Sequence, residues 1–155
     1  MAGLRFNWTA SAPTGFYVEH PLKLARGELV LLCLPPSVET LGRRRGYLPA
    51  GECHGRSSPA LKRLVGLPGD TITLDESFLA VNGAVLLRAP IQAFDSSGRP
   101  LAHAPFGARV LLPGQVWVQG LNSARSWDSR YFGPIPVESL MGNVRPLLTI
   151  NLEHP

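Results

Sequence analysis

The sequence predicts a mainly β fold built from short antiparallel strands. Its apolar runs are short, and Gly and Pro, which number 16 and 15 among 155 residues, are scattered between them as turn residues are. No segment has the periodicity of a long amphipathic helix, and no internal repeat is present. Many short strands separated by turns are typical of an all-β architecture with few, short helices.

The first half of the chain contains three expected strands. Gly27–Leu34 is an apolar run flanked by Gly and Pro-Pro, which predicts a buried strand. Leu61–Val65 is a second apolar stretch, and Thr71–Leu74 alternates as a half-buried strand does. Between the first two strands, Pro35–Gly55 is rich in Pro, Gly and Arg, and we expect it to be a loop.

A hairpin is the clearest local signal in the second half. Two apolar runs within Phe78–Leu87 flank Asn82-Gly83, the preferred pair for a two-residue type I′ turn. The remaining expected strands are Arg109–Leu112, Gln115–Gln119 and Asn143–Leu152.

Composition and charge narrow the class of protein. Hydrophobic residues make up 45% and charged residues 17%, which predicts a globular domain and excludes a disordered chain. The net charge of +4 raises the question of nucleic-acid binding. However, the one basic run, Arg43–Arg45, has no interleaved aromatic side chains for stacking, so we expect no nucleic-acid partner. No apolar stretch is long enough to span a bilayer.

The two cysteines, Cys33 and Cys53, form no Cys-x-x-Cys motif, which excludes a zinc ribbon or a thioredoxin motif. They are either buried free thiols or a disulfide formed in an oxidising compartment, and we favour the free thiols. The chain has four histidines: His20, His54, His103 and His154. Their spacing matches no metal-ligand motif, so we expect neither a metal nor another cofactor.

A candidate nucleophile is Ser11, in the segment Thr9–Tyr17. Pro13 and Gly15 follow it and constrain the backbone in a non-helical form, which can hold a hydroxyl in one orientation and turn N–H groups toward an oxyanion. A serine in an ordinary turn is the alternative. A candidate base is Lys62, which has apolar neighbours, since burial lowers a lysine pKa from about 10.4. The alternative is a strand-edge lysine whose ammonium reaches water.

The segment Gly120–Pro134 alternates hydrogen-bonding side chains with aromatic ones. Ser126 could orient a neutral lysine amine by a hydrogen bond. Asp128 and Arg130 could form a charge-assisted pair that fixes the loop. A loop held together by its own polar side chains, with no role in chemistry, is the alternative.

Taken in order, three segments resemble the conserved boxes of signal-peptidase-type serine proteases. They are Arg26–Val30 (RGELV), Lys62–Asp70 (KRLVGLPGD) and Ser126–Gly133 (SWDSRYFG). The resemblance extends from about Asn7 to Pro146, nearly the whole chain. It implies a compact antiparallel β core with a small β-rich excursion, and we expect a single catalytic domain, 1–155, with candidate excursions at 36–58 and 78–113.

Two further patterns resemble one branch of this family, the TraF-type peptidases that process conjugal-transfer pilins. They are Asn7-x-Thr9-x-Ser11-x-Pro13-x-Gly15-x-Tyr17, and Arg45–Pro49 followed by Cys53. Ordinary leader peptidases differ here: they place Met after the nucleophile, where this chain has Ala12, and usually Gly-Asp-Asn where it has Gly-Leu-Asn at 120–122.

The resemblance implies a role for each candidate residue: Ser11 as nucleophile, Lys62 as general base, Thr9 in the oxyanion hole, Ser126 as hydrogen-bond partner of the base, and Asp128 with Arg130 as a supporting ion pair. It also implies an exported pilin precursor as substrate, with cleavage or ring closure through an acyl-enzyme. Family members carry an N-terminal membrane anchor and act on the periplasmic face of the bacterial inner membrane. We expect this chain to lack that anchor.

Two other functions stay open. One is a general type I signal peptidase that cleaves secretory leader peptides. The other, of a different class, is a non-catalytic scaffold of a conjugation or secretion complex, although a chain that keeps both Ser11 and Lys62 argues against it.

Overall fold

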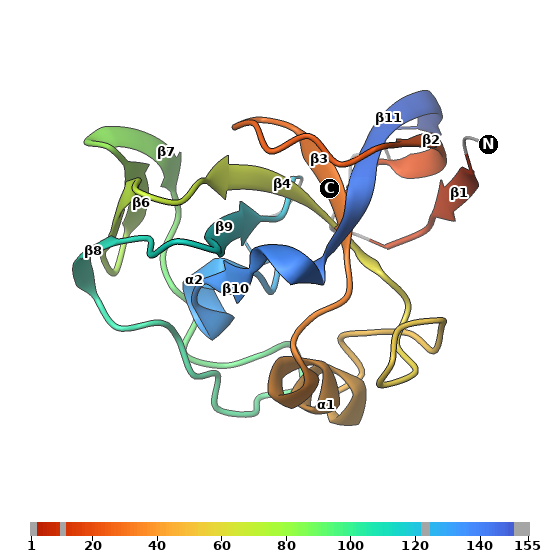
Figure 1. Ribbon diagram of the computed structural model, residues 1–155. Coiled ribbons are helices and arrows are strands. Elements are labelled where there is room, and N and C mark those ends of the chain that lie inside the picture. Colours follow the sequence, from red (N-terminus) through yellow and green to blue (C-terminus); the bar gives the residue numbers. More distant parts are fainter. Residues whose placement is uncertain (1–2, 10–11, 122–124, 151–155) are drawn as a thin grey trace.

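The computed structural model describes residues 3–9, 12–121 and 125–150. Two antiparallel sheets and two short α-helices form the chain (Figure 1). In chain order the elements are β1 (Leu4–Asn7), β2 (Thr14–His20), β3 (Leu29–Leu32), α1 (Pro36–Arg44), β4 (Ala60–Gly66), β5 (Thr71–Leu74), β6 (Phe78–Val81), β7 (Ala84–Arg88), β8 (Gly107–Val110), β9 (Gln115–Gln119), α2 (Ser129–Phe132), β10 (Ile135–Pro136), a 3-10 turn (Val137–Ser139) and β11 (Leu140–Ile150). The prediction of a mainly β fold is confirmed.

The larger sheet has seven strands in the order β1-β2-β11-β3-β4-β9-β10, and the smaller has four in the order β7-β6-β5-β8. Figure 1 shows the smaller sheet at one side of the molecule, β1 and β2 at the other, and α1 below the larger sheet. Strand β4 lies inside the larger sheet, between β3 and β9. Any side chain on β4 is therefore flanked by neighbouring strands on both sides, which favours its burial.

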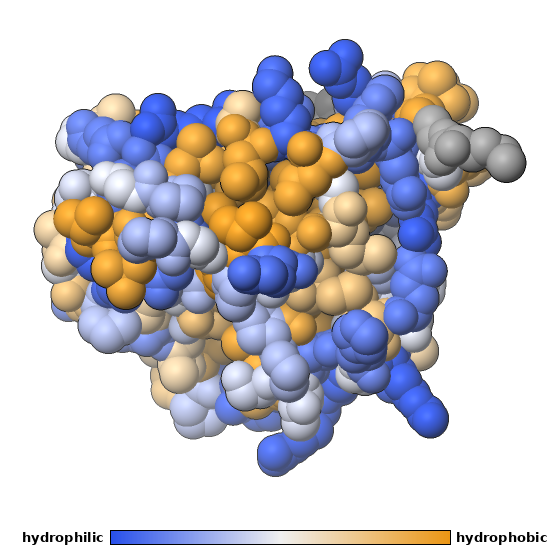
Figure 2. Space-filling view, viewed as in Figure 1, coloured by the Kyte–Doolittle hydropathy of each residue, from blue (hydrophilic) through white to orange (hydrophobic). Residues whose placement is uncertain are grey.

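Three buried apolar clusters stabilise this arrangement. The first packs β3, β4 and β9 against α1 and β10, through Val30, Leu32, Leu34, Leu48, Leu64, Val116, Val118, Ile135 and Leu140. The second joins the two sheets through Val65, Ile72, Leu74, Leu79, Val81, Ala104, Leu111 and Trp117. The third lies under β2 and contains Ala12, Tyr17, Leu31, Leu61 and Val144. Figure 2 shows further apolar side chains at the surface over β4 and β9, with hydrophilic ones around them.

The expected hairpin is confirmed. Strands β6 and β7 pair antiparallel, with Val81 opposite Ala84. The two residues between them, Asn82 and Gly83, have φ of 50° and 81°. Positive φ at both central positions is what a type I′ turn requires, and Asn and Gly tolerate it better than other residues.

The expectation of a loop over Pro35–Gly55 is wrong for its first part, which forms α1. The helix begins at Pro36, where the fixed φ of proline suits the first helical position. Its fully buried residues are Glu39 and Gly42, and Val38 is only partly buried against the first apolar cluster, so the sequence lacks a regular apolar stripe. In the same way, the single turn of α2 lies inside the segment expected to be a loop, and β1 and β2 were not expected at all.

The expectation of free thiols is also wrong. Cys33 and Cys53 form a disulfide with a Cα–Cα distance of 5.6 Å. The bond joins the residue after β3 to the segment that leads back to β4. Spacing along the chain did not reveal the pairing, because it depends on α1 turning the chain back toward the sheet.

Among residues 3–9, 12–121 and 125–150, no helix is long and apolar enough to cross a membrane. The longest described helix, α1, has 9 residues.

Candidate active site

Lys62 lies in the middle of β4, opposite Val30 of β3, and its side chain is only 5% exposed. Alternation along the strand places it on the same face as Ala60 and Leu64, whose side chains belong to or border the first apolar cluster. Burial lowers the pKa of the Lys62 amine, because the charged form loses its hydration. The alternative of an ammonium reaching water at a strand edge does not fit this position.

Two further charges act on Lys62, and they oppose each other. Asp128 raises the pKa of the lysine and Arg130 lowers it. Both belong to the loop and helix turn that follow β9, the strand adjacent to β4. Desolvation is the largest of the three effects, so the pKa of the Lys62 amine is lowered overall.

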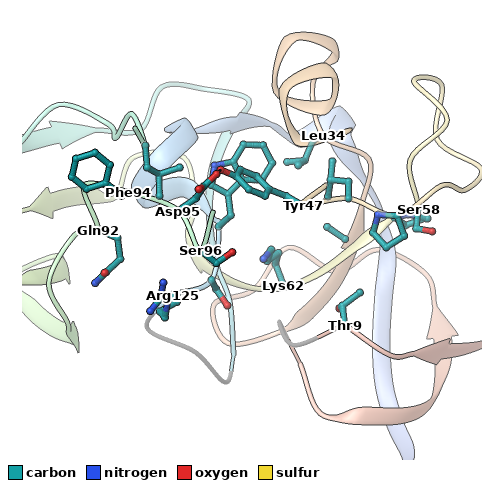
Figure 3. Close-up of a pocket in the computed structure, with 17 residues that line it drawn as sticks. Thr9, Leu34, Tyr47, Ser58, Lys62, Gln92, Phe94, Asp95, Ser96 and Arg125 are labelled. Carbon is teal, nitrogen blue, oxygen red and sulfur yellow. The ribbon is translucent and has the colours of Figure 1, made fainter. Parts of the chain in front are cut away.

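A cavity of about 320 Å³ opens beside Lys62. Thr9 and Ser126 line it together with Lys62, so the structure brings these three predicted site residues together. Figure 3 shows the Lys62 side chain at the centre, with Thr9 on one side and Arg125 on the other. The remaining walls are largely apolar and aromatic: Leu34, Tyr47, Leu48, Pro49, Phe94, Leu101 and Trp127.

Asp128 and Arg130 form a buried bidentate ion pair. The Arg130 Nε donates to Asp128 Oδ1 and its Nη2 to Asp128 Oδ2, each at 2.9 Å. Their side chains are 0% and 1% exposed. Burial alone would lower the pKa of Arg130, but the hydrogen bonds and charge of Asp128 raise it, so the guanidinium stays charged. The predicted pairing of these two residues is thus present.

This ion pair holds the backbone around Ser126. Arg130 Nη2 donates to the carbonyl oxygen of Ser126 at 3.0 Å, and the amide of Gly120 donates to Asp128 Oδ2 at 2.9 Å. Ser129 adds a third tie, since its hydroxyl accepts from the amide of Val118 at 3.0 Å. The polar side chains after β9 therefore fasten the loop to the end of that strand.

Ser126 is nearly buried and packs directly on Gly120. A Cβ at Gly120 would lie 2.2 Å from both the Cβ and the Oγ of Ser126. Only glycine leaves room for this approach. The close packing of the Ser126 side chain therefore explains why residue 120 is a glycine.

Asn7 holds the loop that precedes β2 through side-chain hydrogen bonds. The sequence did not predict this role. Its Nδ2 donates to the carbonyl oxygens of Thr9, Ala12 and Pro13 at 3.0–3.2 Å. Its Oδ1 accepts from the hydroxyl of Thr9 at 2.7 Å. The signal that could have found it was the first position of the Asn7-to-Tyr17 pattern.

The candidate nucleophile, Ser11, lies outside the described residues. Of the described residues near it in sequence, Thr9 lines the cavity with Lys62, and Ala12 packs in the same buried cluster as Leu61, the neighbour of Lys62 on β4. The described part of this loop is therefore next to β4.

The aromatic wall of the cavity was also not predicted. Tyr47 and Trp127 pack edge to face, with ring centroids 5.0 Å apart. Tyr47 lies within Arg45–Pro49, which the sequence comparison with TraF-type peptidases singled out without giving it a function. Among the residues that the structure describes, no three His, Cys, Asp or Glu side chains gather as metal ligands would.

A cavity lined by a buried amine of lowered pKa and by the hydroxyl groups of Thr9 and Ser126 has groups suited to proton transfer to and from an attacking oxygen. Comparison with known proteins points the same way. The model of the signal peptidase family, peptidase S26, matches residues 8–148.

The plasmid transfer protein TraF of Escherichia coli is 36% identical over 151 residues, which cover 96% of this chain and 84% of that protein. The conjugal transfer protein TraF of Agrobacterium fabrum is 36% identical over 155 residues, covering 97% and 85%. Signal peptidase I of Bacillus caldolyticus is 31% identical over 91 residues, covering 54% and 50%. Among solved structures, a signal peptidase I from Enterococcus faecalis V583 matches with a TM-score of 0.48 and 22% identity, covering 81% of this chain and all of that one. The family match and the two TraF relatives extend over nearly the whole chain, and this chain belongs to the signal peptidase family, peptidase S26.

Proposed function

We propose that this chain is a serine endopeptidase with a Ser11–Lys62 dyad that processes an exported pilin precursor for conjugative transfer. The observation that carries the proposal is the Lys62 amine, buried in the interior of the sheet at the edge of a cavity, with its pKa lowered by that burial. A lysine that is neutral near physiological pH can act as a general base, and an exposed one cannot.

In the first step, the Lys62 amine accepts the hydroxyl proton of Ser11 while the serine oxygen attacks the scissile carbonyl carbon. The tetrahedral intermediate then collapses, the C–N bond breaks, and the leaving amine takes the proton from Lys62. The resulting acyl-enzyme is attacked by water, which gives a linear product. Attack by the amino terminus of the substrate itself gives a ring.

The oxyanion requires hydrogen-bond donors. The Ser11 backbone N–H is one candidate, and Thr9 is the other. In the structure the Thr9 hydroxyl donates to Asn7, so it serves the oxyanion only if it exchanges that partner during the reaction. Loss of one donor of this kind typically costs about 3 kcal/mol of barrier.

The supporting residues act through Lys62. Ser126 lines the cavity beside the amine and can accept or donate a hydrogen bond to it. Arg130 donates to the Ser126 carbonyl oxygen, and Asp128 and Arg130 place one negative and one positive charge near the base. We assign these three residues to positioning rather than to proton transfer.

The conjugative role rests on the TraF relatives, which the chain matches over 96% and 97% of its length. We place its action at the periplasmic face of the bacterial inner membrane, as the resemblance to TraF-type peptidases implies. The Cys33–Cys53 disulfide supports an oxidising compartment, because disulfides persist there and are rare in the cytosol.

A general signal peptidase is the second candidate, supported by the match to signal peptidase I of Bacillus caldolyticus. The two differ in substrate range. Cleavage of many unrelated secretory precursors would favour the second candidate, and cleavage restricted to the pilin precursor would favour the first.

The test is intact-mass analysis of wild type, Ser11→Ala and Lys62→Ala, each incubated with a candidate pilin precursor and, separately, with a serine-acylating inhibitor. We expect a covalent adduct on Ser11 in the wild type that both variants lose. The mass of the pilin product separates the two fates, since ring closure removes one water. A folded wild type with neither adduct nor product overturns the proposal in favour of a scaffold.

A further inference from the structure

Two segments that are far apart in the sequence meet at the cavity. The first segment, residues 36–58, contributes Tyr47, Leu48, Pro49 and Ser58 to the lining. The second segment, residues 78–113, contributes Gln92, Phe94, Asp95, Ser96 and Leu101. This wall of the cavity is therefore made of residues from both segments, and its shape depends on the contact between them.

Polar contacts fasten the two segments together. The hydroxyl of Tyr47 donates to Asp95 Oδ2 at 2.6 Å. Around it, Arg45 Nη1 donates to the carbonyl oxygen of Pro100 at 2.7 Å, and Arg99 Nη2 donates to the carbonyl oxygen of Arg45 at 2.8 Å. We call the Tyr47–Asp95 contact, with these two arginine bonds, the clasp.

Hydrogen bonds from the turn that follows Asp95 fix the orientation of its carboxylate. Its Oδ1 accepts from the amides of Ser97 and Arg99, each at 2.9 Å, and its Oδ2 also accepts from Arg99 Nε at 2.7 Å. The side chain is 5% exposed. The Tyr47 hydroxyl, and then the amides and guanidinium of the turn, hold the pKa of Asp95 well below its usual range, so it is a carboxylate at neutral pH.

The Tyr47 ring connects the clasp to the Ser126 loop, which lines the cavity near Lys62. It packs edge to face on Trp127, which follows Ser126, and the Arg99 guanidinium lies 5.8 Å from its ring centroid. Figure 3 shows Tyr47 and Asp95 next to each other on the same side of Lys62. One side chain thus contacts the second segment through its hydroxyl and the Ser126 loop through its ring.

Each segment is also anchored independently of the clasp. The first is tied by the Cys33–Cys53 disulfide and by Glu39, whose carboxylate accepts from the amides of Gly55 and Ser57, each at 3.0 Å. The second is tied by the β5–β8 pairing and by the amide of Ala104, which donates to the carbonyl oxygen of Arg130 at 2.9 Å. Loss of the clasp should therefore loosen the cavity wall without unfolding either segment.

We propose that the Tyr47–Asp95 contact positions the substrate cavity for binding: it joins the two segments into one fixed wall of that cavity and so sets the affinity for peptide substrates. This inference rests on the proposed peptidase function. The largely apolar and aromatic lining suits an apolar side chain of an extended substrate, which a fixed wall binds more tightly than a mobile one.

The test compares Tyr47→Phe, Asp95→Asn and the double variant. Tyr47→Phe keeps the ring on Trp127 and removes only the hydroxyl. Asp95→Asn keeps an oxygen for the amides of the turn and replaces the Oδ2 acceptor. Thr40→Ala is the matched control, because Thr40 is an exposed residue of the same segment whose hydroxyl bonds only within α1, to Pro36. Thermal unfolding of the oxidised proteins checks that each variant is folded.

Two reactions are measured for each protein: cleavage of a quenched fluorogenic peptide that spans the junction of the candidate pilin precursor, and acetylation by p-nitrophenyl acetate, in which the serine oxygen takes the acetyl group and p-nitrophenolate leaves. The acetylation rate measures the reactivity of the dyad without a bound peptide, so dividing the peptide kcat/KM by it corrects for damage to the dyad. We expect the ratio of peptide kcat/KM to acetylation rate to fall about 3- to 10-fold in Tyr47→Phe, through KM, as loss of one hydrogen bond predicts. Asp95→Asn should fall at least as far, because its Oδ2 also accepts from Arg99 Nε. The double variant should fall no further than the worse single one.

An unchanged ratio in both single variants, or a loss confined to kcat, overturns the inference. Peptide binding by calorimetry to Ser11→Ala, with and without Tyr47→Phe, separates this failure from failure of the proposed function. Weaker binding on removal of the hydroxyl supports the clasp even where no acetylation occurs. A wild type that neither reacts nor binds the peptide overturns both proposals.

Discussion

The guanidinium of Arg130 meets the carboxylate of Asp128 edge to edge, with two hydrogen bonds of 2.9 Å, in the buried environment next to Lys62. The pair is internally neutral, so it can support a buried base without deciding its charge. Removing either partner leaves one uncompensated charge, and the two removals should act on Lys62 in opposite directions.

Asp128→Asn should shift the pH–rate profile toward lower pH. Without the carboxylate, which raises the pKa of Lys62, the remaining Arg130 charge favours the neutral amine at lower pH. Arg130→Met should shift the profile toward higher pH. Each variant should also lose about 3–5 kcal/mol of stability, the usual cost of breaking a buried pair. The measurements are kcat/KM against pH and chemical denaturation, and shifts of the same sign in both variants would contradict the explanation.

Lys62→Met should reduce peptidase activity by about 10⁴-fold or more, as loss of a member of a catalytic unit does. It should also change the pH dependence of stability. The pKa of Lys62 is lower in the folded state than its ordinary value of 10.5, so between these two values the unfolded state binds more protons and wild-type stability rises with pH.

Methionine has no such titration. The stability of the variant relative to the wild type should therefore be greatest at neutral pH and should fall as the pH approaches 10.5. Thermal unfolding of both proteins from pH 7 to 10.5 measures it. Parallel curves over this range would show that the amine is charged in the folded protein, and would count against its role as a base.

The double variant Cys33→Ser/Cys53→Ser should lose about 3 kcal/mol of stability, the loop-entropy estimate for cysteines 20 residues apart. Because the bond fastens the segment that carries Tyr47 and Leu48, peptide KM should rise as well. Mild reduction of the wild type should reproduce both effects and leave the double variant unaffected. A reduced wild type with unchanged KM would show that the disulfide is not needed to hold the segment in place.

Gly120→Ala should impair catalysis by displacing Ser126, since the added methyl group would lie 2.2 Å from its Cβ and Oγ. We expect a loss of about 1–3 kcal/mol of stability from overpacking, and a larger loss of kcat than of peptide affinity. Gly3→Ala is the control, because its new methyl group meets only the carboxylate end of the Glu19 side chain, which can move. Equal effects of both substitutions on kcat would argue against a positioning role for Ser126.

Periodicity and turn chemistry were sufficient to predict several elements. The hairpin at Asn82-Gly83 and β9 at Gln115–Gln119 follow from local preferences, which act within a few residues. Helix α1 was missed for the opposite reason. Its buried face carries Glu39 and Gly42, whose burial depends on Ser57 and Trp127, residues that are distant along the chain.

In the candidate site too, local features could be predicted from the sequence and contacts between distant segments could not. The types of residue required for the chemistry, a lysine among apolar neighbours and a paired Asp128 and Arg130, were visible in the sequence because they lie on single strands or within one turn. The Cys33–Cys53 bond, the loop organised by Asn7 and the Tyr47–Asp95 clasp were not. Sequence alone predicted the central strands, the Asn82-Gly83 turn and the residues of the candidate dyad. Only the tertiary structure decided which distant segments enclose the cavity, because such contacts depend on how the sheets pack and not on the residues next to them in the chain.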